Sequence, residues 1–250
     1  MKANVLRLAQ NQQGRDFVVG DIHGEWQQLT TLLTRVNFNT DNDRLLAVGD
    51  IIDRGPDSLK LVELLKQPWF YCCRGNHEDV LLRYCRQQDQ QLARNWQGFG
   101  GEWFFQLNHE QQDDVYAAVN EHTVLAIEVE TLMGLIGVVH ADVPVSLSWP
   151  EITQALQQAD ADMQEWVMWS RARIKAEKSF VVHGIERLFV GHTIVKQSRH
   201  LANVHYIDTG AFTRSQRSPK GLQNQQRKEA SSAGHLTLIE LAPDYPERRS

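Results

Sequence analysis

The chain has few cysteines, three among 250 residues, at Cys72, Cys73 and Cys85. Two of them are adjacent and none forms a Cys-x-x-Cys pair, so the sequence favours neither a disulfide framework nor a structural zinc site. Long apolar runs are also missing: the longest, residues 132–139, is interrupted by glycine and too short to cross a bilayer. The first residues lack the apolar core of a signal peptide. We therefore expect a cytoplasmic protein without a membrane partner.

An excess of positive charge is absent too. The chain carries 26 Lys and Arg against 31 Asp and Glu, a formal net charge of −5. This balance gives no reason to expect a nucleic-acid partner, since nucleic-acid-binding domains carry a basic patch. Any positive charge that binds a phosphate group must therefore be local, from metal ions or a few arginines. The composition, 42% hydrophobic and 23% charged, is that of a soluble globular protein, and a monomer is the default expectation.

Three early segments repeat one design, in which a short apolar run ends at a glycine-containing turn and a helical pattern follows. The runs are residues 17–19, 45–48 and 69–73. Short apolar runs that end at glycine are typical of buried strands. Repeated strand–turn–helix units predict an α/β fold built on βαβαβ units, with a largely parallel sheet in the first half.

The second half of the chain has a different pattern. We predict strands at residues 124–129, 135–140, 188–190, 204–207 and 236–241, and one substantial helical region around residues 160–178. No linker rich in Pro, Ser or Gly divides the halves, so we expect a single domain over residues 1–250. Residues 214–233 are rich in Gln, Ser and basic side chains and predict a flexible insertion before the final strand.

Side chains that bind metal ions follow five of the predicted strands. They are Asp21 and His23, Asp50 and Asp53, Asn76 and His77, His140 and Asp142, and His192. Because open α/β sheets place ligands at the carboxyl ends of their strands, we expect these side chains to meet in one sheet region. Asp or Asn after a single strand is ordinary turn chemistry, but histidine at four of five ends is not. The mixed oxygen and nitrogen set, without sulfur, suits two divalent metal ions that share a carboxylate.

Three of these segments resemble the signature motifs of the phosphoprotein phosphatase family, which has the metallophosphoesterase fold. They are Gly-Asp-Ile-His-Gly at 20–24, Gly-Asp-Ile-Ile-Asp-Arg-Gly at 49–55 and Gly-Asn-His-Glu at 75–78. The sequence is most similar to the small bacterial and bacteriophage lambda serine/threonine protein phosphatases. The resemblance implies a calcineurin-like β-sandwich of mixed sheets flanked by helices. It also implies a phosphorylated protein or peptide as substrate, with phosphoserine and phosphothreonine as targets and phosphotyrosine as an addition.

By that resemblance, two divalent metal ions would be bound by six of the side chains. Asp21 and His23 would hold the first ion, Asp50 would bridge, and Asn76, His140 and His192 would complete the second. Manganese is the metal we expect, with iron, zinc and nickel as alternatives. Hydrolysis would proceed by attack of a metal-bound hydroxide on the phosphomonoester.

The resemblance implies roles for four further residues. His77 would be the general acid that protonates the leaving oxygen, oriented by Asp53. Arg54 and Arg171 would bind phosphate oxygens. Arg173 lies two residues beyond Arg171 and could serve in its place.

The main alternative on the same scaffold is a diadenosine tetraphosphatase, which cleaves a dinucleoside polyphosphate. Those relatives usually have Ala before the Arg-Gly of the second motif and Asp after the Asn-His of the third. Here the two positions are Asp53 and Glu78, which favours the protein phosphatase. A cyclic-nucleotide or nucleic-acid phosphodiesterase is disfavoured by the negative net charge. A non-catalytic phosphoprotein-binding module is disfavoured because every expected ligand is present.

Three further features have structural interpretations. The aromatic cluster between Trp96 and Phe105 is interpreted as core or as a lid. Glu78 is expected to open the helix that follows it, because a negative charge is favourable at a helix N-terminus. Asp142 is interpreted mainly as a stabiliser of the loop after His140.

Overall fold

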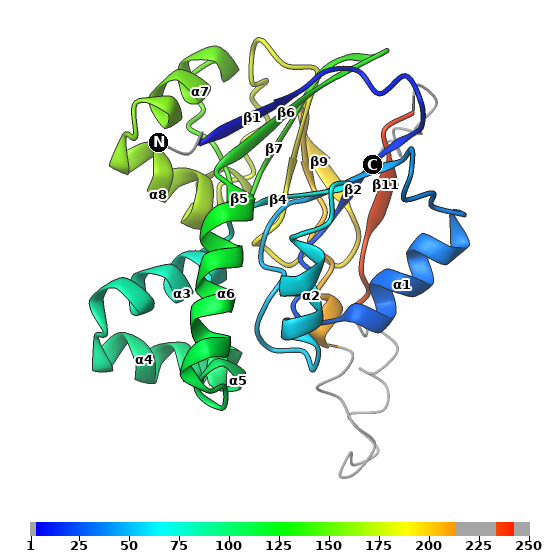
Figure 1. Cartoon of the computed structure of the whole chain (residues 1–250). Helices are drawn as coiled ribbons and strands as arrows, with labels where there is room; N and C mark the ends of the chain where they lie inside the picture. The colour runs from blue at the N-terminus through cyan, green and yellow to red at the C-terminus, as the bar shows by residue number, and fades with distance from the viewer. Residues whose placement is uncertain (1–3, 214–233, 243–250) are drawn as a thin grey trace, which may run out of the picture.

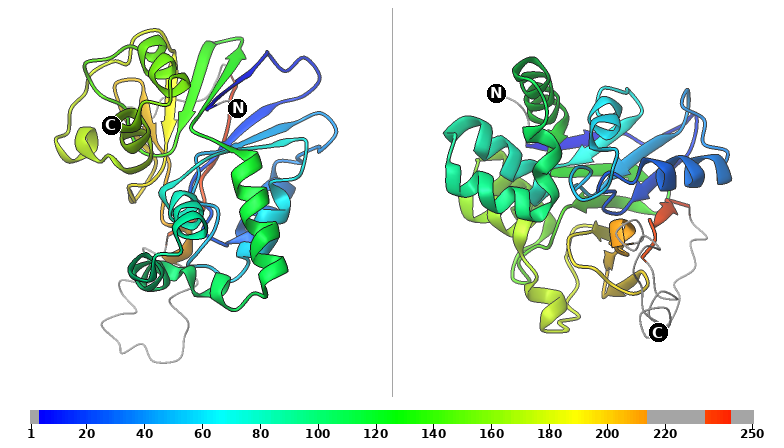
Figure 2. Two further views of the ribbon diagram at one scale, coloured as in Figure 1. Left: turned by 60° about the vertical axis from the view of Figure 1, so that its left-hand side comes forward. Right: turned by 90° about the horizontal axis from the view of Figure 1, so that it is seen from below.

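Two β-sheets lie face to face in the middle of the molecule, and helices cover both outer faces (Figures 1 and 2). The structure is a computed structural model that describes residues 4–213 and 234–242. Among these residues, one sheet has five strands in the order β11-β2-β3-β4-β5, and the other has six in the order β1-β6-β7-β8-β10-β9. The expected sandwich of mixed sheets flanked by helices is confirmed. The insertion expected at 214–233 lies outside the described residues.

The five-stranded sheet contains the repeated units of the first half. Its strands are β2 Asp16–Val19, β3 Arg44–Ala47, β4 Phe70–Cys73, β5 Thr123–Val124 and β11 Leu238–Glu240. β2, β3, β4 and β5 run parallel, and β11 is antiparallel to β2. Helix α1 Trp26–Arg35 connects β2 to β3, and α2 Ser58–Leu64 connects β3 to β4. The prediction of βαβαβ units is therefore confirmed.

The six-stranded sheet belongs mostly to the second half of the chain. Its strands are β1 Val5–Leu8, β6 Ala126–Thr131, β7 Gly134–Val139, β8 Arg187–Val190, β9 Arg199–Leu201 and β10 Val204–Tyr206. The single strand predicted at 124–129 is wrong. The chain crosses between the sheets at Leu125, so Thr123–Val124 pairs with β4 while Ala126 begins the β6–β7 hairpin. β1 and β9 were not predicted.

The remaining helices pack outside the sheets. They are α3 Asn76–Gln87, α4 Gln90–Trp96, α5 Glu102–Phe105, α6 His109–His122, α7 Trp149–Gln157, α8 Ala161–Trp169 and α9 Ala172–Lys175. A π-helical turn, Gln97–Gly101, joins α4 to α5. The helical region expected at 160–178 is thus two helices, and α7 was not predicted. Within the described part of the chain, no helix is long and apolar enough to cross a membrane.

Alternate residues of the central strands are buried on opposite faces of their sheet. Phe17 and Leu45 pack in the apolar cluster under α1, α2 and α6, whereas Val18 and Leu46 pack in the cluster between the two sheets. Both faces are covered, which explains why these strands are apolar without alternation. A third cluster, with Trp149 of α7, lies on the outer face of the six-stranded sheet. This packing brings the carboxyl ends of strands from both sheets to one place.

Candidate active site

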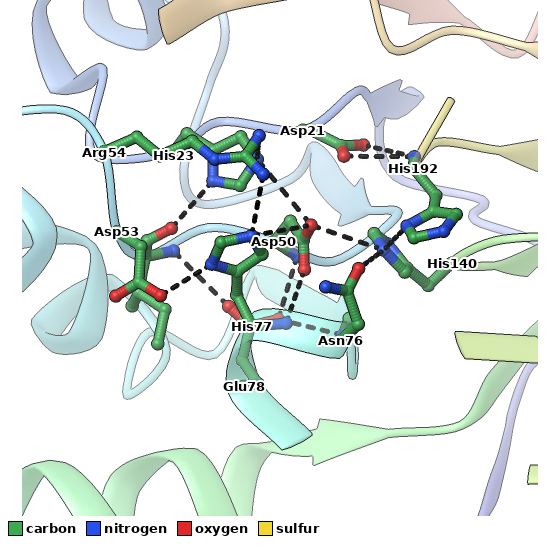
Figure 3. A network of polar contacts seen from close by, with 12 residues as sticks. Asp21, His23, Asp50, Asp53, Arg54, Asn76, His77, Glu78, His140 and His192 are labelled. Atoms are coloured by element: carbon green, nitrogen blue, oxygen red, sulfur yellow. Dashed lines mark hydrogen bonds and ion pairs between the residues drawn. The ribbon is translucent and has the colours of Figure 1, made fainter. Parts of the chain in front are cut away.

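Asp50, in the loop after β3, lies at the centre of the predicted site (Figure 3). Its Oδ2 atom is 3.6 Å from His23 Nε2, 3.4 Å from His140 Nε2 and 3.9 Å from His77 Nε2. All four side chains are buried. The predicted ligands therefore come together around a shared carboxylate.

The side chains around Asp50 fall into two groups, each able to hold a metal ion. Within the described residues, ligand atoms of His23, Asp50 and His77 lie within 4.8 Å of one another, as do those of Asp50, His140 and His192. One part of the sequence-based expectation is wrong. The ligand-bearing strand ends do not share one sheet: the first residues follow β2, β3 and β4 of the five-stranded sheet, whereas His140 and His192 follow β7 and β8 of the other.

In the second group, buried ring nitrogens point their lone pairs at one another, an arrangement that a shared cation or proton would stabilise. His140 Nδ1 lies 3.1 Å from the oxygen of Val48, and His192 Nε2 lies 3.1 Å from that of Trp169, so these nitrogens carry the protons and donate. The other nitrogens, His140 Nε2 and His192 Nδ1, face each other at 3.2 Å. Asn76 Oδ1 is 3.0 Å from His140 Nε2. Neutral imidazoles fixed by backbone carbonyls are typical metal ligands, so the residues fit a metal ion.

The first group is prepared in the same way. His23 Nδ1 lies 2.9 Å from the oxygen of Ile52, which leaves Nε2 with its lone pair. Burial lowers the pKa of His23 well below its usual value, and burial with the nearby His140 lowers the pKa of His192 to about 3. Both rings therefore stay neutral at pH 7, the form that binds metals.

Asp21 belongs to neither of these groups, although it was predicted as a ligand. Its carboxylate accepts the backbone N–H of His192, at 3.0 Å and 3.2 Å from the two oxygens. A Cβ on Gly191 would collide with the same carboxylate. Burial and the charges of Asp208 and Asp50 raise the pKa of Asp21 well above its usual value. Such a crowd of buried carboxylates is costly unless a cation offsets it.

His77, a member of the first group, also forms a buried pair with Asp53. His77 Nδ1 lies 2.6 Å from Asp53 Oδ2. Burial lowers the pKa of His77, but the charges of Asp50 and Asp53 and the hydrogen bond to Asp53 outweigh it, so the pKa is raised. A charged imidazole whose Nδ1 is bound by a carboxylate can donate a proton from Nε2.

Two tryptophans also bind Asp53, and the sequence did not identify them. Trp96 Nε1 and Trp103 Nε1 each lie 2.7 Å from an Asp53 oxygen. The aromatic cluster was interpreted as core or as a lid, and Trp96 is indeed fully buried. The one available signal was chemical, because a buried indole N–H needs an acceptor. Nothing in the spacing indicates which acceptor it finds.

Glu78 holds the loop after β3 against the start of α3. Its carboxylate accepts the backbone N–H groups of Asp50 at 2.8 Å, Ile51 at 2.9 Å and Gly75 at 2.8 Å. Burial and the Asp50 charge raise the pKa of Glu78 to about 7, against the lowering effect of these donors. Glu78 lies in the first turn of α3, as expected. Its contacts show a larger function, which is to fix the backbone that carries Asp50.

Backbone strain is concentrated in the same loops. The left-handed region is occupied by His23 (φ 46°), Asp50 (φ 49°), Asp53 (φ 71°), Arg54 (φ 68°) and His192 (φ 66°). Each such residue costs roughly 1–2 kcal/mol relative to a right-handed conformation. Strain of this kind persists where surrounding contacts fix the backbone, and it is concentrated at functional sites.

Three arginines were considered for phosphate binding, and the structure separates them. Arg54 Nη1 is 2.9 Å from His23 Nε2 and Nη2 is 3.0 Å from His77 Nε2, so its guanidinium lies over the site (Figure 3). Arg171 Nη2 donates to the oxygen of His192 at 3.3 Å. Arg173 is 1% exposed and binds Asp142 Oδ1 at 3.1 Å. It is therefore a structural side chain, which agrees with the interpretation of Asp142.

Comparison with known proteins defines the class to which this site belongs. Residues 17–196 match the calcineurin-like phosphoesterase family. The chain therefore belongs to the calcineurin-like phosphoesterases, which accounts for the two packed sheets.

Individual relatives carry more particular descriptions. Serine/threonine-protein phosphatase 1 of Salmonella typhimurium strain LT2 is 36% identical over 198 residues, 78% of this chain and 86% of the relative. The asymmetrical bis(5'-nucleosyl)-tetraphosphatase PrpE of Bacillus cereus strain Q1 is 25% identical over 221 residues, 78% of this chain and 85% of the relative. A protein serine/threonine phosphatase from Saccharomyces cerevisiae has the same fold, with a TM-score of 0.61 at 15% identity over 98% of this chain and 86% of its own.

Proposed function

We propose that this protein is a serine/threonine protein phosphatase that hydrolyses phosphomonoesters at a dinuclear metal centre. One observation carries the proposal: two buried groups of possible ligands share Asp50, and His77 of the first group is paired with Asp53. The relative from Salmonella typhimurium is described by the same activity. We also propose that the chain is a single-domain monomer. Its few cysteines are in line with a further proposal, a cytoplasmic location.

The proposed ligands follow the assignment that the family resemblance implies. His23 and Asp21 would hold the first ion, Asp50 would be shared, and Asn76, His140 and His192 would hold the second. The set contains carboxylate, amide and imidazole donors without sulfur, which suits manganese, and also iron, zinc or nickel. When bound, the two ions supply positive charge that lowers the pKa of a water molecule and offsets the charge of the phosphoryl group.

The protein's own residues position the substrate and move one proton. Arg54 and Arg171 donate hydrogen bonds to phosphoryl oxygens, which a planar guanidinium can bind through two N–H groups. His77 donates its Nε2 proton to the serine or threonine oxygen as the ester bond breaks, so that no bare alkoxide is expelled. Asp53 stabilises the imidazolium and keeps its ring in place.

The second candidate is a dinucleoside-polyphosphate hydrolase, in view of the relative from Bacillus cereus. Asp53 argues against it. At that position the rival family usually has Ala, whereas here a completely buried Asp accepts three hydrogen bonds, one of them from His77. Proton donation by a His–Asp pair is most useful for a poor leaving group such as the serine oxygen.

A side-by-side rate comparison tests the proposal. We expect manganese-dependent phosphate release from phosphoserine and phosphothreonine peptides, with slower phosphate release from a phosphotyrosine peptide. Cleavage of diadenosine tetraphosphate, followed by the nucleotides it forms because it releases no inorganic phosphate, should also be slower. A chelator should abolish all four rates, and manganese should restore them. Faster cleavage of diadenosine tetraphosphate than of every phosphopeptide would favour the second candidate. Full activity in the chelator would overturn the metal-dependent mechanism.

A further inference from the structure

The Asp53 carboxylate is bound by more donors than the three signature motifs supply. Trp96 Nε1 donates to Oδ2 and Trp103 Nε1 to Oδ1, each at 2.7 Å, and His77 Nδ1 lies 2.6 Å from Oδ2. The carboxylate is completely buried. The two indoles therefore hold the carboxylate through both of its oxygens.

Both tryptophans belong to one short segment that also holds Arg54. The segment runs from the end of α4 through the π-helical turn into α5. In the turn, Gly100 (φ 101°) accepts the backbone N–H of Arg54 at 3.1 Å. A Cβ on Gly100 would lie 2.5 Å from the Arg54 nitrogen, so the close approach requires glycine. The segment thus binds the Asp53 carboxylate at both oxygens and the strained Arg54 backbone at one point.

Ordinary core packing does not explain this arrangement. A buried indole N–H needs an acceptor, and any free carbonyl oxygen would serve. Here two indoles from different helices choose the same carboxylate, and each takes a different oxygen. With one donor on each oxygen the carboxylate plane cannot rotate freely. The direction in which Oδ2 faces His77 is therefore set from outside the His–Asp pair.

We propose that Trp96 and Trp103 are positioning residues for proton donation, a role that rests on the proposed function. They hold the Asp53 carboxylate aimed at His77 Nδ1, which fixes the orientation of the His77 ring. They act through Asp53 and do not contact the substrate. The consequence is selective, because a serine alkoxide needs a proton when it leaves, whereas p-nitrophenolate leaves readily without one.

The first test compares two leaving groups in Trp103→Phe and Trp96→Phe, with Trp69→Phe as the matched control. Trp69 packs against Phe38, away from the site. We expect kcat on a phosphoserine peptide to fall at least about tenfold in either tryptophan variant, with KM unchanged and kcat on p-nitrophenyl phosphate within about threefold of wild type. Equal losses on both substrates would overturn the proposal. Trp103 is only half-buried, so it remains informative if Trp96→Phe unfolds.

The second test asks whether the tryptophans act through Asp53. Residues that work through a common partner show non-additive losses in a double-mutant cycle. We expect Trp103→Phe to lower the phosphoserine kcat in the wild-type background and to have no further effect in Asp53→Asn. Losses that multiply in the double variant would show an independent role and would overturn the proposal.

The third test does not depend on any substrate. In protein labelled with ¹⁵N-histidine, the Nδ1 proton of His77 should give a protected signal far downfield, because it is held against Asp53. We expect this signal to shift or to be lost by exchange in Trp103→Phe and to stay unchanged in Trp69→Phe. An unchanged signal in Trp103→Phe would contradict the proposal. A wild type that releases no phosphate from phosphoserine would instead count against the proposed function, and this spectrum would still decide on the tryptophans.

Discussion

The five-stranded and six-stranded sheets meet at one site but supply different groups to it. β2, β3 and β4 are followed by carboxylates, an amide, the imidazole of His23 and the His77–Asp53 pair. The six-stranded sheet supplies the imidazoles of His140 and His192, after β7 and β8. The two contributions are not independent. His140 is oriented by the carbonyl of Val48, which follows β3, and the His192 backbone is bound by Asp21, which follows β2. The five-stranded sheet therefore positions the ligands of its partner as well as its own.

Asp50→Asn should disable the contributions of both sheets at once, because Asp50 is the carboxylate shared by both ligand groups. We expect the variant to lose both metal ions and to fall to background phosphate release, whichever sheet supplies the other ligands. Metal content after desalting, measured with activity, checks the outcome. Asp57→Asn, at the start of α2 and outside both groups, is the control and should keep both. Activity in Asp50→Asn that also survives a chelator would refute the assignment.

His77→Asn should separate the two duties of the five-stranded sheet, metal binding and proton donation. We expect both ions to be kept, while turnover on phosphoserine falls by about 10²–10⁴-fold. The raised pKa of His77 means that its proton is present at low pH and is lost as the pH rises through that pKa. Wild-type turnover should therefore decline on the alkaline side, and this decline should vanish in the variant. Loss of both metal ions would make His77 a ligand instead.

β2, β3 and β4 could be predicted from the sequence because both of their faces are largely buried. Such strands are short apolar runs, and each ends at a glycine-containing motif. β1 and β9 lie at the edges of the other sheet and are partly exposed, so their apolar pattern is weak. α7 had a visible start, with Ser148 and Glu151 forming a capping box around Pro150. α7 was not predicted although this capping signal is present in the sequence.

The site could be predicted where its residues lie within one motif, and not where packing brings them in. Asp53 and His77 follow neighbouring strands, so their proximity follows from sheet geometry. The contact of Trp96 and Trp103 with Asp53 depends on how α4 and α5 turn back over the loop, which no spacing records. Likewise, the chain's crossing at Leu125 placed His140 in a different sheet from Asp50.

His23→Asn and His192→Asn should show how much metal binding each sheet contributes, because each variant removes one proposed ligand from one sheet. Both residues have left-handed φ, which Asn tolerates better than most residues, so the backbone should be preserved. We expect each variant to bind one ion weakly and keep the other. Activity should fall by more than the roughly 10–100-fold that is typical when only an outer-shell partner of a ligand is changed. Metal titration by calorimetry distinguishes the two events. Loss of both ions in His192→Asn alone would show that the six-stranded sheet controls the whole centre.

The smallest effect on activity is expected from two ion pairs whose members are not among the proposed ligands, one in each half. Asp142→Asn leaves the buried Arg173 without its carboxylate and should lower the free energy of unfolding by about 3 kcal/mol. Asp43→Asn removes the partner of Arg15, which is 37% exposed, and should cost about 1 kcal/mol.

The contribution of Asp43 to stability should depend on pH. Burial raises the pKa of Asp43, but the hydrogen bond from Arg15 and backbone donors outweigh it, so the pKa is lowered. The Asp43 contribution is therefore present above its unfolded pKa and is lost as the pH falls through the lowered value. Urea unfolding at pH 7 and pH 3 measures the free energy of unfolding of both variants, with turnover and metal content as controls. Equal losses of stability in the two variants would contradict the difference expected from burial. Loss of metal in either variant would mean that its ion pair is not separate from the site.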